Sequence, residues 1–289
     1  KSAKLGKAGK TGRAARVLAR KTNSIASTVH QHIYKRSNLV EYIETNKKTD
    51  LKTTFDLKIN DNSLNTIYII DEASMISNIP SNNNNLLYGT GNLLSDIIKF
   101  TFNPMIETNH KLIFIGDQAQ LPPINCYTSP ALDAEILEKY EVLQKKMVIE
   151  EHTLMEIVRQ NKMNKILEDA FSLRNQIEND KFVKFSISTN SDNCKELNYY
   201  DLENRFVYNY LQDNPNKPIM ITHSNAASRY KNEWIRKKIY KPLCDHENCN
   251  DIFRCSNLSY LEPNESLISI HNSYKYNILN GDSFTVKEV

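Results

Sequence analysis

The sequence is poor in several residue types, and each scarcity excludes a class of protein. Only 7 Gly and 9 Pro occur among 289 residues, which excludes collagen-like and Gly/Pro-rich disordered polymers. The longest apolar runs, such as 112–115, are far too short to span a bilayer. The five cysteines are odd in number and scattered, unlike the disulfide framework of a secreted domain. We therefore expect a soluble intracellular protein, cytoplasmic or nuclear and without membrane contact.

Acidic residues are missing from the first 36 positions, which hold ten Lys or Arg. Because the whole chain carries +3, the remaining residues carry a net charge of −7. A basic arm is either a solvated tail or a contact surface for a polyanion, and composition leaves both open. The Asn-, Lys-, Ile- and Tyr-rich composition hints at a viral or other AT-rich source.

The length and the element pattern predict an α/β protein of two domains. Buried strands are predicted at 66–70, 111–115 and 218–222, and a hairpin near 53–59. Helices are expected at 11–19, from about 27, and at 93–100, 131–143, 152–174 and 226–239. Strands that alternate with helices favour parallel sheets. A polar stretch at 175–193 suggests domains 1–175 and 176–289.

The strongest local signal is a pair of acids, Asp71 and Glu72, directly after the first strand. The carboxyl end of a parallel strand is where α/β sheets bind ligands. In nucleotide hydrolases one such acid holds Mg²⁺ and the next orients the attacking water. Taken by itself, the pair is better explained as an ordinary strand that ends in solvated acids.

A second strand ends in a distinctive loop at 116–123, which reads Gly-Asp-Gln-Ala-Gln-Leu-Pro-Pro. A glutamine beside a γ-phosphate can detect its loss by hydrogen bonding, and the Pro-Pro pair would fix the path of the loop. A tight turn with polar filler is the plainer interpretation. The spacing from Asp71 and Glu72 favours the functional one.

These segments together resemble superfamily 1 DNA helicases of the RecD/Dda type, which move 5′ to 3′ on single strands. The matches follow the family's order over nearly the whole chain. They are Thr11-Gly12-Arg13-Ala14-Ala15 with 26–30 (motif Ia), 70–75 (Walker B), 116–123 (motif III), 154–160 (motif IV), 221–236, and Asn280-Gly281-Asp282, which resembles the turn that opens an SH3-like insertion. The resemblance implies two RecA-like domains with parallel central sheets, incomplete at both ends.

The resemblance also implies roles in ATP hydrolysis. Asp71 would hold Mg²⁺, and Glu72 would polarise the water. Gln120 would sense the γ-phosphate, with Gly116 and Asp117 beside the nucleotide. Arg159 would be an arginine finger that stabilises charge during phosphoryl transfer, although a surface Arg on a helix is the simpler alternative.

The same resemblance implies a path for single-stranded DNA along the basic arm. Its contacts would be Thr11, Arg13, Thr28 and His30 in the first domain, and Thr222 and Asn225 in the second. Such binding should weaken with salt, because it releases counterions from the phosphates. His30 is equally interpreted as a helix-packing residue. Replication or repair proteins are the partners such a motor implies, and we expect a monomer.

The chain departs from the family at its phosphate-binding loop. The segment 6–11 suggests one, but the G-x-x-x-x-G-K-[ST] spacing requires a glycine where Lys4 stands. No apolar strand is predicted before it, and Thr11 and Gly12 already belong to motif Ia. The family's last two motifs have no counterpart either. We expect an internal piece that hydrolyses ATP poorly alone, or a chain that has abandoned ATP binding.

A cysteine cluster lies in a possible insert at 241–257. Cys244, His246, Cys249 and Cys255 could supply four zinc ligands, but their gaps are wider than those of most zinc sites, which favours reduced surface cysteines. The leading hypothesis is an ATP-dependent 5′–3′ DNA helicase acting in replication, recombination or repair. The alternative is a non-hydrolysing single-strand-binding or scaffolding protein on the same fold, and a zinc-dependent nucleic-acid module is a third possibility.

Overall fold

The computed structural model describes residues 4–9, 12–43, 49–80, 86–144, 147–156, 158, 164–179, 181, 184, 186–189, 194–212, 214, 217–240, 261–270, 276, 278 and 282–288. The chain divides into two compact units. The first comprises Lys1–Glu156 and Ile268–Phe284, and the second Ile157–Leu267 and Thr285–Val289. The predicted α/β class is confirmed.

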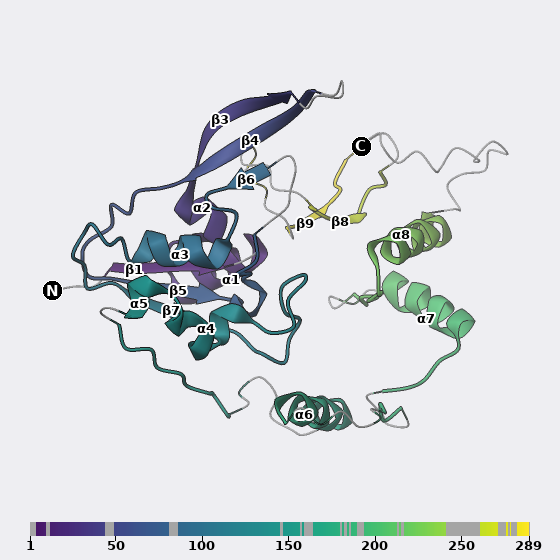
Figure 1. The fold of residues 1–289 in the computed structure, drawn as a ribbon. Coiled ribbons are helices and arrows are strands. Elements are labelled where there is room, and N and C mark those ends of the chain that lie inside the picture. The colour runs from purple at the N-terminus through teal and green to yellow at the C-terminus, as the bar shows by residue number, and fades with distance from the viewer. Residues whose placement is uncertain are drawn as a thin grey trace. The chain divides into compact units, whose positions relative to one another are not determined.

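A four-stranded parallel sheet organises the first unit (Figure 1). Its strand order is β2 (Ala26–Thr28), β1 (Lys4–Gly9), β5 (Thr66–Asp71) and β7 (Lys111–Phe114). In the register, Gly9 lies beside Asp71 and Ile70 beside Phe114. Because all four strands run the same way, their carboxyl ends meet at one edge of the sheet, where Asp71 lies.

Helix α3 (Leu93–Thr101) covers one face of this sheet (Figure 1). The apolar residues Leu94, Ile97 and Ile98 recur at helical spacing and are at most 1% exposed. On β5 the side chains alternate, so that Tyr68 points toward the helix and its ring meets that of Phe100 edge-on. Each such buried side chain stabilises the fold by roughly 1.5–3 kcal/mol. Helix α1 (Gly12–Thr22) follows β1.

A mixed sheet adjoins this core. Strands β3 (Tyr34–Ile43) and β4 (Thr49–Leu57) form a long antiparallel hairpin, and β6 (Leu86–Tyr88) pairs with β4 in parallel. The hairpin extends away from the four-stranded sheet (Figure 1). The sequence predicts a hairpin near 53–59, but most of that stretch belongs to the single strand β4. The observed hairpin pairs β4 with β3, which begins directly after α2 (Val29–Ile33).

The predicted helix at 131–143 is wrong as one continuous element. It is broken into the 3-10 turn η2 (Pro130–Leu132) and the short helices α4 (Ala134–Glu138) and α5 (Glu141–Gln144). Asp133 explains the first break, because its side chain accepts a hydrogen bond from the Ile136 amide at 3.1 Å and starts a new helix.

Three helices dominate the second unit: α6 (Lys165–Glu178), α7 (Tyr199–Leu211) and α8 (Asn225–Tyr240). Helix α8 confirms the prediction at 226–239. The predicted helix at 152–174 is wrong in its first half, since 152–156 are not helical and a cap at Asn164 starts the helix. Residues 218–222 join no strand ladder in the described part of the chain. Strands β8 (Ser266–Ile268) and β9 (Ser283–Thr285) pair with each other.

Candidate functional site

The acid pair lies on a sharp turn at the carboxyl end of β5. Asp71 is the last residue of the strand, and its Oδ1 accepts a hydrogen bond from the Glu72 amide at 3.0 Å. Glu72 has a left-handed backbone, with φ 57° and ψ 39°. A non-glycine residue in this region costs roughly 1 kcal/mol or more, and such strain tends to occur at functional sites. The turn orients both carboxylates, which are half-buried.

The turn continues into η1 (Ala73–Met75), which packs directly against the loop after β7. The Ala73 amide donates to the Ile115 carbonyl at 2.9 Å, and the Ile115 amide donates to the Ile70 carbonyl at 2.8 Å. Gly116 makes the approach possible: a Cβ there would lie 2.8 Å from the Ser74 amide nitrogen and 2.9 Å from Leu132 Cδ1. Since the Ser74 amide is backbone and cannot swing aside, only glycine fits here. The structure thus brings the two predicted motifs together.

Hydrogen bonds within the 116–120 loop give it a defined shape. Asp117 Oδ1 accepts from the Ala119 amide at 3.0 Å, and the Asp117 carbonyl accepts from the Gln120 amide at 3.1 Å. Gln118 Nε2 donates to the Leu132 carbonyl at 2.7 Å, which ties the loop to η2. The side chain of Gln120 is exposed, so its amide is available to a ligand.

The carboxylates at this edge suit a hard cation held mainly by phosphate and water. In the described part of the chain, no three His, Cys, Asp or Glu residues gather into a metal-binding group. Magnesium in nucleotide-hydrolysing sites needs only one or two protein carboxylates, because the phosphates and water supply the other ligands. Asp71, fixed by the Glu72 amide, fits that requirement.

The predicted DNA contacts of the first unit lie in two environments. Thr28 is 5% exposed, and its hydroxyl caps α2 by accepting from the Gln31 amide at 3.2 Å. His30 packs against the rings of Tyr34 and Tyr88, at 5.6 and 4.9 Å between centroids. Arg13 is in the first turn of α1, and Thr11 is outside the described residues. Both Thr28 and His30 therefore have structural tasks, and their contact with DNA stays a prediction.

The glycine-rich segment is not a loop where it is described. Gly6 and Gly9 belong to β1, which pairs with β2 on one side and β5 on the other. The sequence predicts no apolar strand before the segment 6–11. The observed strand β1 instead runs through most of that segment, and main-chain hydrogen bonds to two neighbours form it despite its lysines and glycines. A helix follows directly, as the motif Ia interpretation of 11–15 requires.

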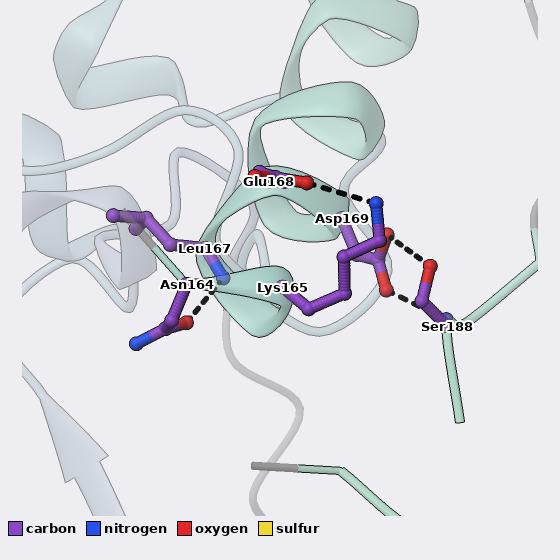
Figure 2. Close-up of polar contacts among 6 residues, drawn as sticks. All are labelled: Asn164, Lys165, Leu167, Glu168, Asp169 and Ser188. Carbon is purple, nitrogen blue, oxygen red and sulfur yellow. Dashed lines mark hydrogen bonds and ion pairs between the residues drawn. The ribbon is translucent and has the colours of Figure 1, made fainter. Parts of the chain in front are cut away.

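Arg159 and Gln160 lie outside the described residues, and so do Gly281 and the entire cluster Cys244, His246, Cys249 and Cys255. The nearest described element after Arg159 is the start of α6. Figure 2 shows that Asn164 caps this helix by accepting from the Leu167 amide at 3.0 Å. Asp169 accepts from the Ser188 amide at 2.7 Å and from its hydroxyl at 3.1 Å, which fixes the chain after α6 to the helix (Figure 2).

The second unit's predicted contacts, Thr222 and Asn225, flank the start of α8. The Thr222 hydroxyl donates to the Ser224 carbonyl at 3.2 Å, and the Ala227 amide donates to Ser224 Oγ at 3.1 Å. Asn225 is exposed at the first position of the helix. Ser224 thus caps α8, and contact of Thr222 and Asn225 with DNA stays a prediction.

Sequence reasoning missed two buried groups near these motifs. Ser74 is completely buried beneath Gly116, and only its position after the acid pair hinted at importance. Asp96, also completely buried, accepts from the Tyr34 hydroxyl at 2.7 Å and from the Thr90 hydroxyl at 2.8 Å. Burial and the nearby Asp96 carboxylate raise the pKa of Tyr34 well above its usual value, so the phenol stays protonated and keeps donating.

The fold and the site define an α/β protein whose parallel sheet presents an acid pair and a Gly-Asp loop at its carboxyl edge. Comparison with protein-family models and with curated protein sequences finds no match. None of the described helices combines the length and the apolar character that crossing a membrane requires.

Proposed function

We propose that this chain is the motor core of an ATP-dependent 5′–3′ DNA helicase, built from RecA-like domains and acting in replication, recombination or repair. The observation that carries the proposal is the contact across Gly116, which joins the acid pair to the Gly-Asp-Gln-Ala-Gln loop. A motor needs this connection, because the residue that senses the phosphate must act on the residues that hydrolyse it.

Within this proposal each residue has a task that suits its position. Asp71 would hold Mg²⁺, which supplies positive charge against the phosphates. Glu72, held in a strained backbone, would orient and deprotonate the attacking water. Gln120, whose amide is exposed, would bond a γ-phosphate oxygen. Arg159 would stabilise the charge on the same phosphate.

The test compares Glu72→Gln with wild type in single-turnover ATP hydrolysis, with the full chain in excess and single-stranded DNA present. Excess protein suits a slow reaction. The variant should bind Mg–ATP normally but hydrolyse it at least about 100-fold more slowly, because an amide cannot accept the water's proton. Glu107→Gln, an exposed acid elsewhere in the first unit, is the matched control. Equal rates for Glu72→Gln and wild type would disprove the assignment.

One observation favours the alternative, a non-hydrolysing single-strand-binding or scaffolding protein. Gly6 and Gly9 lie in strand β1 and therefore do not cradle a phosphate. The two proposals separate in a thermal melt. Protection by Mg–ATP supports the helicase, whereas protection by single-stranded DNA alone, without any effect of Mg–ATP, supports the alternative.

A further inference from the structure

Two serine hydroxyls are buried without a hydrogen-bond partner among the described residues, and one of them, that of Ser74, belongs to the turn that carries the acid pair. Ser74 is 0% exposed and belongs to η1, while Ser129 is 3% exposed and precedes η2. The two turns are linked to one loop, since Gly116 touches both Ser74 and Leu132. Two buried hydroxyls without hydrogen bonds need a physical explanation, because most buried polar atoms are hydrogen-bonded.

The cost of each hydroxyl is substantial. A buried polar group with no partner destabilises a fold, because it gives up its hydrogen bonds to water and gains none. A serine that only filled space could be replaced by alanine with a gain in stability. A group that costs stability in one state is explained if it gains a partner in another.

The surroundings of Ser74 identify where that partner would come from. Its own amide nitrogen is the closest atom to the space above Gly116, so its backbone touches the 116–120 loop. The same loop holds the exposed Gln120, and the same turn holds Glu72. Ser129 is different, because it precedes η2 and is not part of the turn that carries the acids.

We propose that Ser74 is a positioning residue whose hydroxyl bonds the 116–120 loop when Mg–nucleotide is bound, which holds Glu72 in its working position. This inference rests on the proposed hydrolytic function. In the structure, the Ser74 hydroxyl has no hydrogen-bond partner among the described residues. When Gln120 engages the phosphate, the loop shifts against η1, and the hydroxyl donates to a carbonyl of the loop.

The test uses the full chain as wild type, Ser74→Ala and Ser129→Ala. Without nucleotide, both variants should melt roughly 2–4 °C higher than wild type, because each loses an unbonded buried hydroxyl. In single-turnover hydrolysis with single-stranded DNA, Ser74→Ala should react about tenfold more slowly, which corresponds to the loss of about one hydrogen bond in the transition state. Its half-saturating protein concentration should be unchanged, and Ser129→Ala should react within about twofold of wild type.

Three results would overturn the inference. The first is a Ser74→Ala variant that hydrolyses ATP as fast as wild type. The second is a lower melting temperature for this variant, which would mean that the hydroxyl is already bonded. A tenfold loss in Ser129→Ala as well would assign the effect to general packing. If wild type itself does not hydrolyse ATP, the proposed function is wrong and this inference falls with it. If wild type is active and Ser74→Ala is equally active, only this inference is wrong.

Discussion

The two compact units are stabilised by different kinds of contact. In the described part of the chain, every buried apolar side chain belongs to the first unit, where α3 packs on the sheet. Among the described residues of the second unit, the buried one is charged: it is Glu203 on α7, which is 6% exposed. Apolar burial is non-directional and tolerates shifts, whereas a buried charge requires a partner in one geometry.

Polar contacts connect the elements of the second unit. Lys231 on α8 bonds both Glu203 and the Tyr199 hydroxyl on α7. Arg236 on the same helix forms a two-pronged pair with Glu265, with Nε–Oε1 at 2.6 Å and Nη2–Oε2 at 3.2 Å. Substitutions should therefore destabilise the first unit mainly by leaving cavities, and the second mainly by leaving charged groups without partners.

The largest effect is expected from Leu94→Ala in the first unit. Leu94 is 0% exposed, and removing a fully buried leucine side chain costs about 3–5 kcal/mol, including the cavity that remains. The only tryptophan, Trp234, lies on α8 in the second unit. Urea unfolding followed by far-UV circular dichroism should therefore show a destabilised phase, while Trp234 fluorescence shifts much less.

The control for this experiment is Ile25→Ala, because Ile25 is 92% exposed and its truncation leaves no cavity. Its transitions should match wild type under both probes. If the urea midpoints from circular dichroism and from Trp234 fluorescence shift equally in Leu94→Ala, the two units unfold as one and do not differ in what stabilises them.

A smaller effect is expected from Lys231→Met in the second unit. The side chains of Lys231 and Glu203 are 12% and 8% exposed, so the variant leaves a carboxylate buried without its cation. Breaking a buried pair costs about 3–5 kcal/mol, and some remaining solvent contact reduces this to about 2–3 kcal/mol. The Trp234 fluorescence midpoint in urea should fall accordingly.

Adding Glu203→Leu to Lys231→Met should recover most of the lost stability, because the unpaired charge disappears. Lys238→Met is the matched control: this lysine also lies over the Trp234 ring, at 5.5 Å, but is exposed. A double variant as unstable as the single one would mean that the stem of Lys231, rather than the ion pair, holds α7 to α8.

The sequence predicted the elements whose pattern is local. The alternation in 66–71 and the helical spacing in 93–101 depend on neighbours along the chain, and both elements appear close to the expected positions. The loop 116–120 was also predicted, because its Gly-Asp pair ends an apolar strand. Asp133 and Asn164 cap helices in the structure, but each lies within a longer stretch of helical periodicity. The sequence pattern therefore predicts helices that are too long at both places.

Contacts distant in sequence were beyond prediction. Nothing near Tyr34 indicates that its hydroxyl meets Asp96, 62 positions away. Likewise, Gly116 was predicted to lie in a loop, but its need for glycine depends on the backbone of Ser74. The acid pair could be chosen from sequence, whereas the buried hydroxyl beside it became visible only from the packing of two turns.

The smallest effect is expected on the pH dependence of the first unit's stability, through His110. Its ring is 5% exposed, packs edge-on against Tyr68, and its Nδ1 accepts from the Thr66 amide at 3.3 Å. Burial lowers the pKa of His110. The unfolded chain therefore binds a proton more readily than the folded one. The contribution of His110 to the stability of the first unit should be fully present above the unfolded pKa of about 6.5 and be lost as the pH falls below it.

His110→Asn isolates this contribution, because its amide oxygen can still accept from Thr66 but does not titrate. We expect the urea midpoint of the circular dichroism transition to fall between pH 7.5 and 5.5 more steeply in wild type than in the variant. Other histidines titrate in both proteins and cancel in the comparison. If the urea midpoints of wild type and His110→Asn fall equally with pH, the protonated ring must find another acceptor in the folded state. The polar contact at the start of β5 would then depend less on one specific partner than the contact between Lys231 and Glu203 does.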